Sequence, residues 1–189
     1  MTIMKKSLSL LCSLCISVLV FADGLTATLQ QGDEMTPFYG VDAFKDCVAL
    51  KAINLGASVK DFSAASFNGC TGLAAITVDK DNKNFKALAN VVYSADGTEL
   101  VMVGVGATAV TVAEGTKVIL ANSFDLAKAA ATITFPVTLV NVKANALDGT
   151  AWFAAQNGVV YAGPVLYKVK GEVADVVVAE GTTSIADGA

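Results

Sequence analysis

The apolar positions of this chain recur at a constant 23-residue interval. Two consecutive copies, residues 44–55 and 67–78, read Phe-x-x-Cys-x-x-Leu-x-x-Ile-x-(Leu/Val). The alternating pair at the end of each copy fits a short strand with one buried face. One such coil cannot bury its own apolar face, but stacked coils can, because each covers its neighbour. The pattern predicts a β-rich solenoid of 23-residue coils with short parallel strands.

The same interval links a later, weaker pair of coils. It separates Phe124 from Leu147, and Ile133 and Phe135 fill the strand positions between them. We expect the corner residues to form a structural ladder inside the stack: Phe44, Phe67 and Phe124, with Cys47 and Cys70. The rival interpretation is an irregular β-sandwich, but a sandwich does not require matched residues at one constant shift.

Two longer segments interrupt the repeat. The separation of Phe67 from Phe124 exceeds one period by more than the length of a further coil. Each interruption contains Val-Val-Tyr, then a turn signal of Asp-Gly or Gly-Pro, then a second apolar stretch. We predict inserted β-hairpins near residues 79–109 and 150–170. We expect them to add length without completing a coil, so that they tolerate substitution better than the repeats.

Residues 1–22 have the pattern of a secretory signal peptide. Lys5 and Lys6 precede a 14-residue apolar run over residues 8–21, and small residues before Asp23 favour cleavage there. The run is shorter than the roughly 20 apolar residues of a membrane anchor. A lipid anchor on Cys12 or Cys15 is the weaker alternative, because leucine precedes each cysteine. No later segment is apolar and long enough to span a membrane.

The remaining chain divides into a lead-in or cap, residues 23–38, and a solenoid over residues 39–189. The full chain has 13 lysines and no arginine or histidine. Removing Lys5 and Lys6 leaves 11 lysines against 17 acidic residues, a net charge of −6. An acidic chain without arginine has no electrostatic footprint for nucleic acid. Without histidine it also lacks the commonest general base and metal ligand.

Two copies of the repeat spell out one consensus: Ile53-Asn54-Leu55, Val59, Phe62, Ser66-Phe67, Cys70 and Leu73, then Ile133-Thr134-Phe135-Pro136, Leu139, Val142 and Ala146-Leu147. In this form the chain resembles the BspA-type leucine-rich-repeat family of bacterial surface and secreted proteins. The resemblance covers about residues 39–189, hairpin insertions included. It implies a leucine-rich-repeat solenoid associated with adhesion and with host or matrix contact, without one shared ligand. Alanine replaces many consensus residues, so we expect less buried apolar area per coil.

We predict no catalytic, cofactor-binding or metal-binding residues. Cys47 and Cys70 are interpreted as buried, inaccessible thiols on adjacent coils, and a disulfide between them is kept as an alternative. Residues 79–84 resemble a calcium loop, but Lys83 stands where an oxygen ligand is required. That segment is interpreted as a solvated polar loop. We therefore predict that the protein is not an enzyme and needs no cofactor.

The predicted function is a secreted or cell-surface binding module for an unknown protein or glycan. Its possible partner contacts are the aromatic residues of the hairpin segments: Tyr93, Trp152, Phe153, Tyr161 and Tyr167. The alternative for these rings is packing of the hairpins onto the solenoid. The rival function is a structural spacer or end fragment of a longer surface protein, favoured by a bland face of Ala, Thr and Lys.

The last residues, Val178 to Ala189, match residues 112–123, and the corner residue Phe124 has no counterpart after Ala189. The sequence thus predicts an incomplete C-terminal coil without a polar cap. Because an open end exposes apolar side chains and unpaired strand edges, we expect self-association through it.

Overall fold

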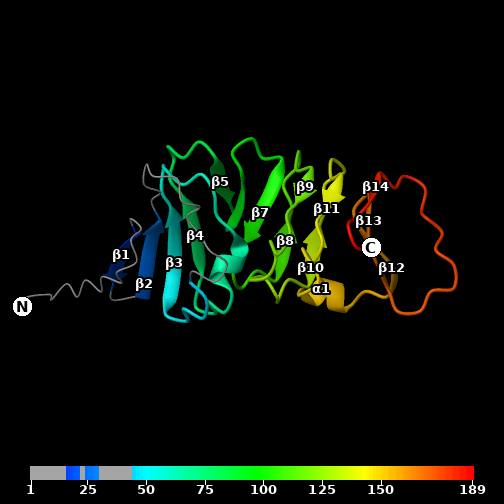
Figure 1. Ribbon diagram of the computed structural model, residues 1–189, viewed down its shortest axis with the longest axis horizontal. Helices are drawn as coiled ribbons and strands as arrows, with labels where there is room; N and C mark the ends of the chain where they lie inside the picture. The colour runs from blue at the N-terminus through cyan, green and yellow to red at the C-terminus, as the bar shows by residue number, and fades with distance from the viewer. Residues whose placement is uncertain (1–15, 22–23, 30–43) are drawn as a thin grey trace, which may run out of the picture.

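The computed structural model describes residues 16–21, 24–29 and 44–189. Short strands stack side by side along one long axis and form a β-solenoid of about six turns (Figure 1). The strands are β1 (Ile16–Phe21), β2 (Gly24–Leu29), β3 (Leu50–Leu55), β4 (Ala75–Val78), β5 (Phe85–Leu88), β6 (Val91–Ser94), β7 (Glu99–Val103), β8 (Ala109–Thr111), β9 (Val118–Ile119), β10 (Thr132–Thr134), β11 (Asn141–Val142), β12 (Gly158–Ala162), β13 (Val165–Lys170) and β14 (Ser184–Ile185). Two short helices, η1 (Ala64–Phe67) and α1 (Ala151–Ala154), lie at corners.

The 23-residue interval is the pairing register of the parallel strands. Strand β3 pairs with β4 so that Ile53 lies opposite Ile76, and β8 pairs with β10 so that Val110 lies opposite Ile133. All four side chains are buried. The predicted solenoid of stacked coils with parallel strands is therefore confirmed.

Both predicted hairpins are present. Strands β6 and β7 pair antiparallel across the turn at residues 95–98, and β12 and β13 pair antiparallel across Gly163. The second strand of each hairpin also pairs parallel with a coil strand, β7 with β9 and β13 with β14. The hairpins are thus strands of the solenoid sheets rather than additions outside the coils.

The first hairpin separates two hydrophobic cores. Val92 and Met102 pack into the core of the N-terminal coils, whereas Tyr93 and Leu100 pack into the core of the C-terminal coils. Both faces of this hairpin are buried, which corrects the expectation that it lies outside the core. The reason is visible in its composition: a strand that is apolar at consecutive positions buries both faces.

The N-terminal strands precede the first coil expected from the sequence. Strand β2 pairs parallel with β3, so the sheet starts before residue 39, and β1 pairs antiparallel with β2. Most of the predicted signal peptide, with its expected cleavage site before Asp23, lies outside the described residues, and its removal stays a prediction. Among the helices of the described residues, none is long and apolar enough to cross a membrane.

Candidate binding groove

Two of the three hairpin tyrosines that were predicted as partner contacts are buried. Tyr93 and Tyr167 are each 2% exposed. The Tyr93 hydroxyl accepts a hydrogen bond from the Ala113 amide at 3.1 Å, and the Tyr167 hydroxyl accepts one from the Leu147 amide at 3.2 Å. These rings fasten the hairpins to the coils, the alternative that the sequence had left open, and they are not available to a partner.

The other three candidate aromatics also make internal contacts. Trp152 packs edge-on against Phe135 at 5.3 Å between ring centroids, and Phe153 packs edge-on against Tyr167 at 5.7 Å. The partly exposed Tyr161 accepts a hydrogen bond from the Ala179 amide at 2.8 Å. Only Trp152 and Tyr161 keep partial exposure, on different elements of the second hairpin region, so the five aromatics do not form one surface.

The outward face of the parallel strands is bland. Its paired positions carry small side chains: Ala52 with Ala75, Asn54 with Thr77, Ala109 with Thr132, and Thr111 with Thr134. Aromatic and arginine anchors, which dominate protein interfaces, are absent from these positions. The strand face is therefore a poor candidate for specific recognition.

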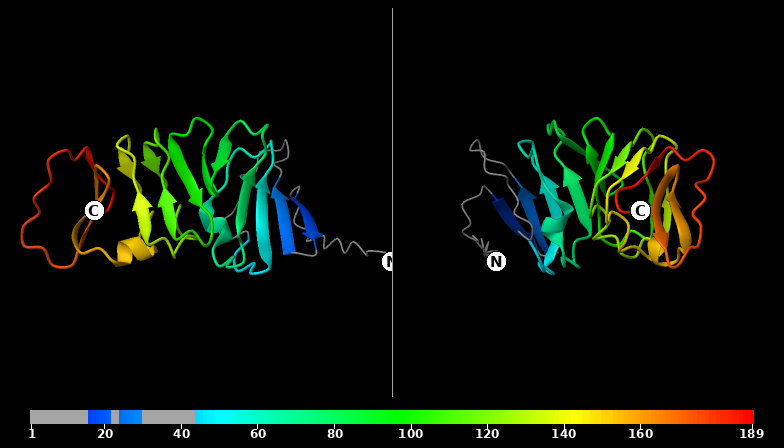
Figure 2. Two further views of the ribbon diagram at one scale, coloured as in Figure 1. Left: turned by 180° about the vertical axis from the view of Figure 1, so that it is seen from behind. Right: turned by 45° about the vertical axis from the view of Figure 1, so that its right-hand side comes forward.

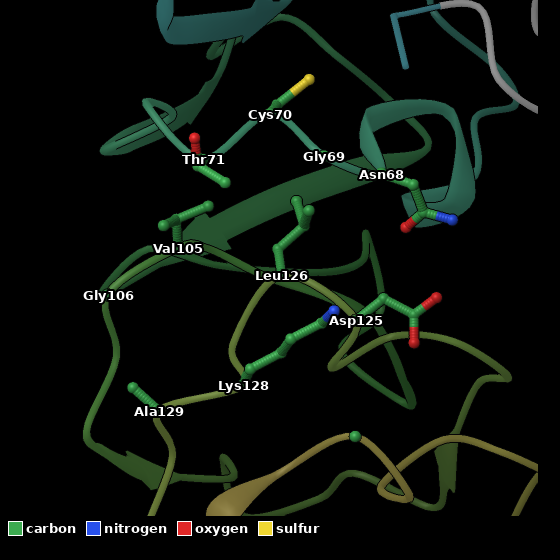
Figure 3. A pocket seen from close by; sticks show the side chains of 11 residues that line it. Asn68, Gly69, Cys70, Thr71, Val105, Gly106, Asp125, Leu126, Lys128 and Ala129 are labelled. Atoms are coloured by element: carbon green, nitrogen blue, oxygen red, sulfur yellow. The ribbon is translucent and has the colours of Figure 1, made fainter. Parts of the chain in front are cut away.

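A hollow among the described residues lies at the corners of the coils instead. We call it the corner groove; its volume is about 680 Å³ and its lining comprises Asn68, Gly69, Cys70, Thr71, Val105, Gly106, Asp125, Leu126, Lys128, Ala129 and Gly149. Figure 3 shows Leu126 rising between Val105 and the corner at residues 68–71. Small residues leave the space open, and Val105 and Leu126 give it an apolar floor.

The groove crosses three equivalent corners of the repeat. Gly69, Leu126 and Gly149 occupy the same position of successive corners, two residues after Phe67, Phe124 and Leu147. Asn68 and Asp125 share the preceding position. The first hairpin lies between the first two of these corners in sequence.

Asp125 is the acidic residue of the groove, and its carboxyl group is partly buried. Burial raises the pKa of its carboxyl group, and the positive charge of nearby Lys128 opposes the shift only in part. Lys128 extends toward Asp125 (Figure 3), but no ion pair within 4.0 Å joins them among the described residues. No hydrogen bond to the Asp125 carboxylate is found in the same part of the chain.

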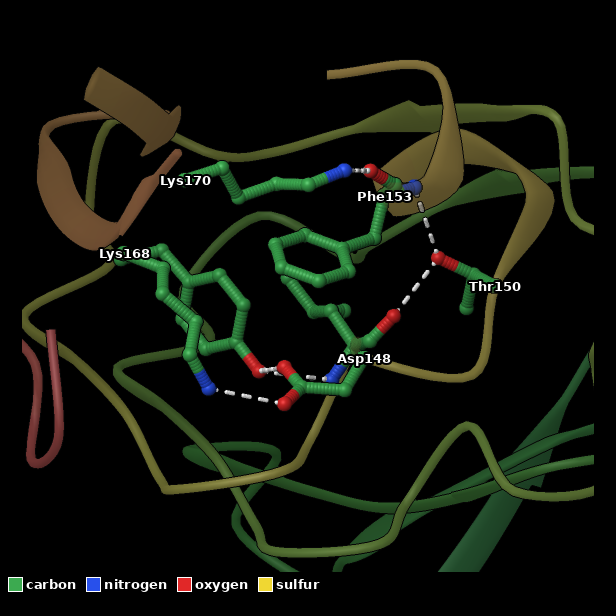
Figure 4. A network of polar contacts seen from close by, with 7 residues as sticks. Asp148, Thr150, Phe153, Lys168 and Lys170 are labelled. Atoms are coloured by element: carbon green, nitrogen blue, oxygen red, sulfur yellow. Dashed lines mark hydrogen bonds and ion pairs between the residues drawn. The ribbon is translucent and has the colours of Figure 1, made fainter. Parts of the chain in front are cut away.

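Asp148 holds the position of Asp125 one coil later, at the same 23-residue interval, and it has partners. Lys168 Nζ lies 2.8 Å from Asp148 Oδ2, and the Tyr167 hydroxyl donates to Asp148 Oδ1 (Figure 4). Burial alone would raise the pKa of Asp148, but the hydrogen bonds from Lys168 and Tyr167 and the charge of Lys168 hold it below its usual value. The second hairpin delivers both partners, since Tyr167 and Lys168 lie on β13.

The same hairpin fixes the short helix α1. The Thr150 side chain caps the helix by accepting from the Phe153 amide at 3.1 Å. Lys170 Nζ donates to the Phe153 carbonyl at 2.8 Å and lies 4.5 Å from the centroid of the Phe153 ring (Figure 4). The polar and aromatic side chains of this region therefore contact one another within the chain.

The predicted ladder residues occupy the coil corners. The rings of Phe44 and Phe67 are stacked with 5.1 Å between centroids, while Phe124 is buried in the core on the other side of the first hairpin. Among the described residues, Cys47 and Cys70 are free thiols. Cys70 donates from Sγ to the Phe44 carbonyl at 2.9 Å, and burial raises the pKa of its thiol. Cys47 is only partly buried, so the prediction that both thiols are inaccessible fits Cys70 alone.

The polar segment at residues 79–84 is a structural tie. Asn82 is buried, and its amide nitrogen donates to the Gly56 carbonyl at 2.7 Å and to the Val59 carbonyl at 3.1 Å. Its Oδ1 accepts from the Asn84 and Phe85 amides. The expectation of a solvated loop was wrong at Asn82, which connects two coils. No group of three or more potential metal ligands is found in the described part of the chain.

Comparison with known proteins places this fold. Stacked parallel coils with a repeated apolar pattern are the features of a solenoid, in which each repeat contacts only its neighbours. Residues 36–92 match the family model described as "BspA type Leucine rich repeat region (6 copies)". This part of the chain is therefore similar to BspA-type leucine-rich repeats. No curated protein matches the chain significantly.

A solved structure supports the fold. A leucine-rich repeat protein from Eubacterium ventriosum superposes with a TM-score of 0.52 at 21% sequence identity, over 72% of this chain and 32% of the other. The pneumococcal vaccine antigen PcpA gives a TM-score of 0.43 at 16% identity, over 72% of this chain and 35% of its own. The present chain thus spans about a third of the length of these proteins.

Proposed function

We propose that this chain is a secreted or cell-surface, non-catalytic binding module that holds a segment of a partner protein in the corner groove. The observation that carries the proposal is the groove itself, which crosses three corners and combines an apolar floor with a carboxylate, an amine and an amide at its edge. Ligand sites of this kind are concave and mostly apolar, with a few polar groups that fix orientation.

The lining favours a peptide over a glycan. No aromatic ring lines the groove, so there is no flat surface on which a sugar ring would stack. Its apolar floor instead fits an aliphatic side chain, and its polar edge fits the amide groups of an extended backbone. Adhesion to host or matrix proteins is the biological setting that the family resemblance favours.

The test compares a blocked groove with a blocked strand face. An added Cβ at Gly149 meets nothing within 4 Å, so Gly149→Trp introduces a bulky ring at the groove with little strain. Ala109→Trp introduces the same ring on the exposed strand face. Both variants and the unmodified chain are measured by interferometry against a panel of purified matrix proteins and glycans. We expect Gly149→Trp to weaken binding by about tenfold or more, equivalent to about 1.4 kcal/mol, and Ala109→Trp to leave it unchanged.

A structural spacer is the second candidate, and the bland strand face favours it. A spacer binds none of the panel at concentrations where a module of ordinary affinity would. Loss of binding with Ala109→Trp but not with Gly149→Trp would instead move the site to the strand face and contradict the groove. Self-association through residues 171–189 stays a prediction, supported by the exposed side chains of Val176, Val177 and Val178.

A further inference from the structure

We propose that the corner groove recognises a basic side chain of the partner segment, with arginine preferred, and that Asp125 is the residue that binds its charge. The inference rests on the proposed function, because it names the chemistry of the same groove. It starts from Asp125, a half-buried carboxylate at the edge of an apolar hollow without a hydrogen-bonding partner among the described residues.

The chain contains an internal precedent for such a complex. At the equivalent corner, Asp148 binds the Lys168 ammonium group at 2.8 Å and the Tyr167 hydroxyl. The second hairpin supplies that cation from within the molecule. At Asp125 no strand of the described chain supplies one, and Asp125 is one of the residues that line the groove. A cation from another molecule would complete at Asp125 what Lys168 completes at Asp148.

The cost of burying the Asp125 carboxylate also favours a bound cation. Removing a carboxylate partly from water costs free energy unless a cation or hydrogen-bond donor replaces the lost water. The raised pKa of Asp125 and the lowered pKa of Asp148 express this difference. The free protein already bears the cost of removing the Asp125 carboxylate partly from water. A ligand cation at Asp125 would offset that cost, and its binding would require little further desolvation of the protein.

The shape of the groove favours arginine. Leu126 and Val105 offer an apolar surface along which the aliphatic stem of a long side chain can lie. A planar guanidinium group can meet both oxygens of a carboxylate at once. Asn68, at the position equivalent to Asp125 in the previous corner, offers an amide oxygen on the same edge (Figure 3).

Lys128 makes the proposal testable in two directions. Its amino group extends toward Asp125 and would repel an incoming cation. Replacing Asp125 should therefore weaken the binding of a cation, and replacing Lys128 should strengthen it. An anionic ligand would show the opposite response to both substitutions.

The experiment uses the full chain and three blocked tripeptides, Gly-Arg-Gly, Gly-norleucine-Gly and Gly-Glu-Gly. Binding is followed by NMR through the methyl signals of Leu126 and Val105. The variants are Asp125→Asn and Lys128→Gln, with Asp175→Asn as a control that makes the same charge change on an exposed loop. We expect the arginine peptide to bind at least about fivefold more tightly than the norleucine peptide. That preference should be lost in Asp125→Asn, increased in Lys128→Gln and unchanged in Asp175→Asn.

The outcomes separate this inference from the proposed function. Equal binding of the arginine and norleucine peptides, or retention of the preference in Asp125→Asn, overturns the role of Asp125 while leaving a peptide groove in place. Preference for the glutamate peptide overturns it as well. If no peptide shifts the groove signals and Gly149→Trp leaves partner binding unchanged, the groove itself is not a binding site. We expect Asp125→Asn to fold, because the substitution removes a charge whose burial is unfavourable.

Discussion

Residues 109–123 and 175–189 carry related sequences, and both contain Val-Ala-Glu-Gly-Thr, but different surroundings cover them. In the first copy Val110 and Val112 are 4% and 2% exposed, because β10 pairs with β8 and its coil covers them. In the second copy the equivalent Val176 and Val178 are each 46% exposed. No strand of the described chain pairs with them, and their loop bulges away from the solenoid (Figure 2).

The coil corners show a similar contrast, in the ion pairing of two aspartates rather than in the burial of valines. Asp148 and Asp125 hold equivalent positions, but only Asp148 receives a cation from the hairpin beside it. In both cases the residue is the same and the neighbouring element differs. Burial and pKa in this solenoid are therefore properties of the contact between coils, as expected where each repeat contacts only its neighbours.

The largest expected effect concerns the first hairpin, whose buried faces make it part of both cores. Met102→Ala should destabilise the protein by about 2–5 kcal/mol, as Leu73→Ala should in a repeat coil, because both side chains are fully buried. Leu88→Ala on β5 of the same region, where Leu88 is 60% exposed, should cost less than about 0.5 kcal/mol. Urea unfolding checks all three. If the Met102 variant were as stable as the Leu88 variant, the first hairpin would not be part of the core.

The two valine copies give the next effect. Val112→Ala should cost about 1–3 kcal/mol, because it removes buried methyl groups between β8 and its neighbours. Val178→Ala should change stability by less than about 0.5 kcal/mol, because its side chain remains half in water. The same unfolding measurement compares them, and equal costs would show that residues 175–178 are covered in solution.

A smaller effect is expected at the two aspartates, with opposite signs. The pKa of Asp148 is lowered in the folded protein, so ionised Asp148 stabilises the fold at pH values above its ordinary pKa of 3.8. This contribution is lost as the pH falls below 3.8. Asp125 has a raised pKa, so protonation stabilises the fold as the pH falls toward 3.8 from above. At pH 7, Asp148→Asn should lower the urea midpoint and Asp125→Asn should leave it equal or higher. A decrease with both variants would mean that Asp125 has a stabilising partner.

The periodic apolar positions were sufficient to predict the coils, because a buried ladder requires the same residue type at one shift. Ile53, Ile76, Val110 and Ile133 follow that rule. The hairpin core was missed although its signal was present: Val91-Val92-Tyr93 and Leu100 to Val103 are apolar at consecutive positions, as in a strand buried on both faces. Composition alone had drawn attention to the tyrosines, whereas their burial depends on which coil the hairpin meets.

The corner groove could not be predicted in the same way. Asn68 and Asp125, which line it, and Asp148 at the equivalent position of the next corner are polar, and a search for repeated apolar residues does not detect them. Even with these positions aligned, the sequence does not say which carboxylate receives a partner. That depends on the path of β13, which brings Lys168 to Asp148 and no cation to Asp125 at the edge of the corner groove.

The most direct test of this account is an NMR titration of the Asp125 and Asp148 carboxyl groups in one sample. Both side chains are observed between pH 2 and pH 7, a range set to include the ordinary aspartate pKa of about 3.9. We predict that Asp125 titrates above that value and Asp148 below it, and that saturating arginine tripeptide lowers the pKa of Asp125 alone. Equal pKa values for the two groups, or an Asp125 pKa that the peptide does not change, would contradict the claim that Asp125 is an unpaired carboxylate that binds a ligand cation.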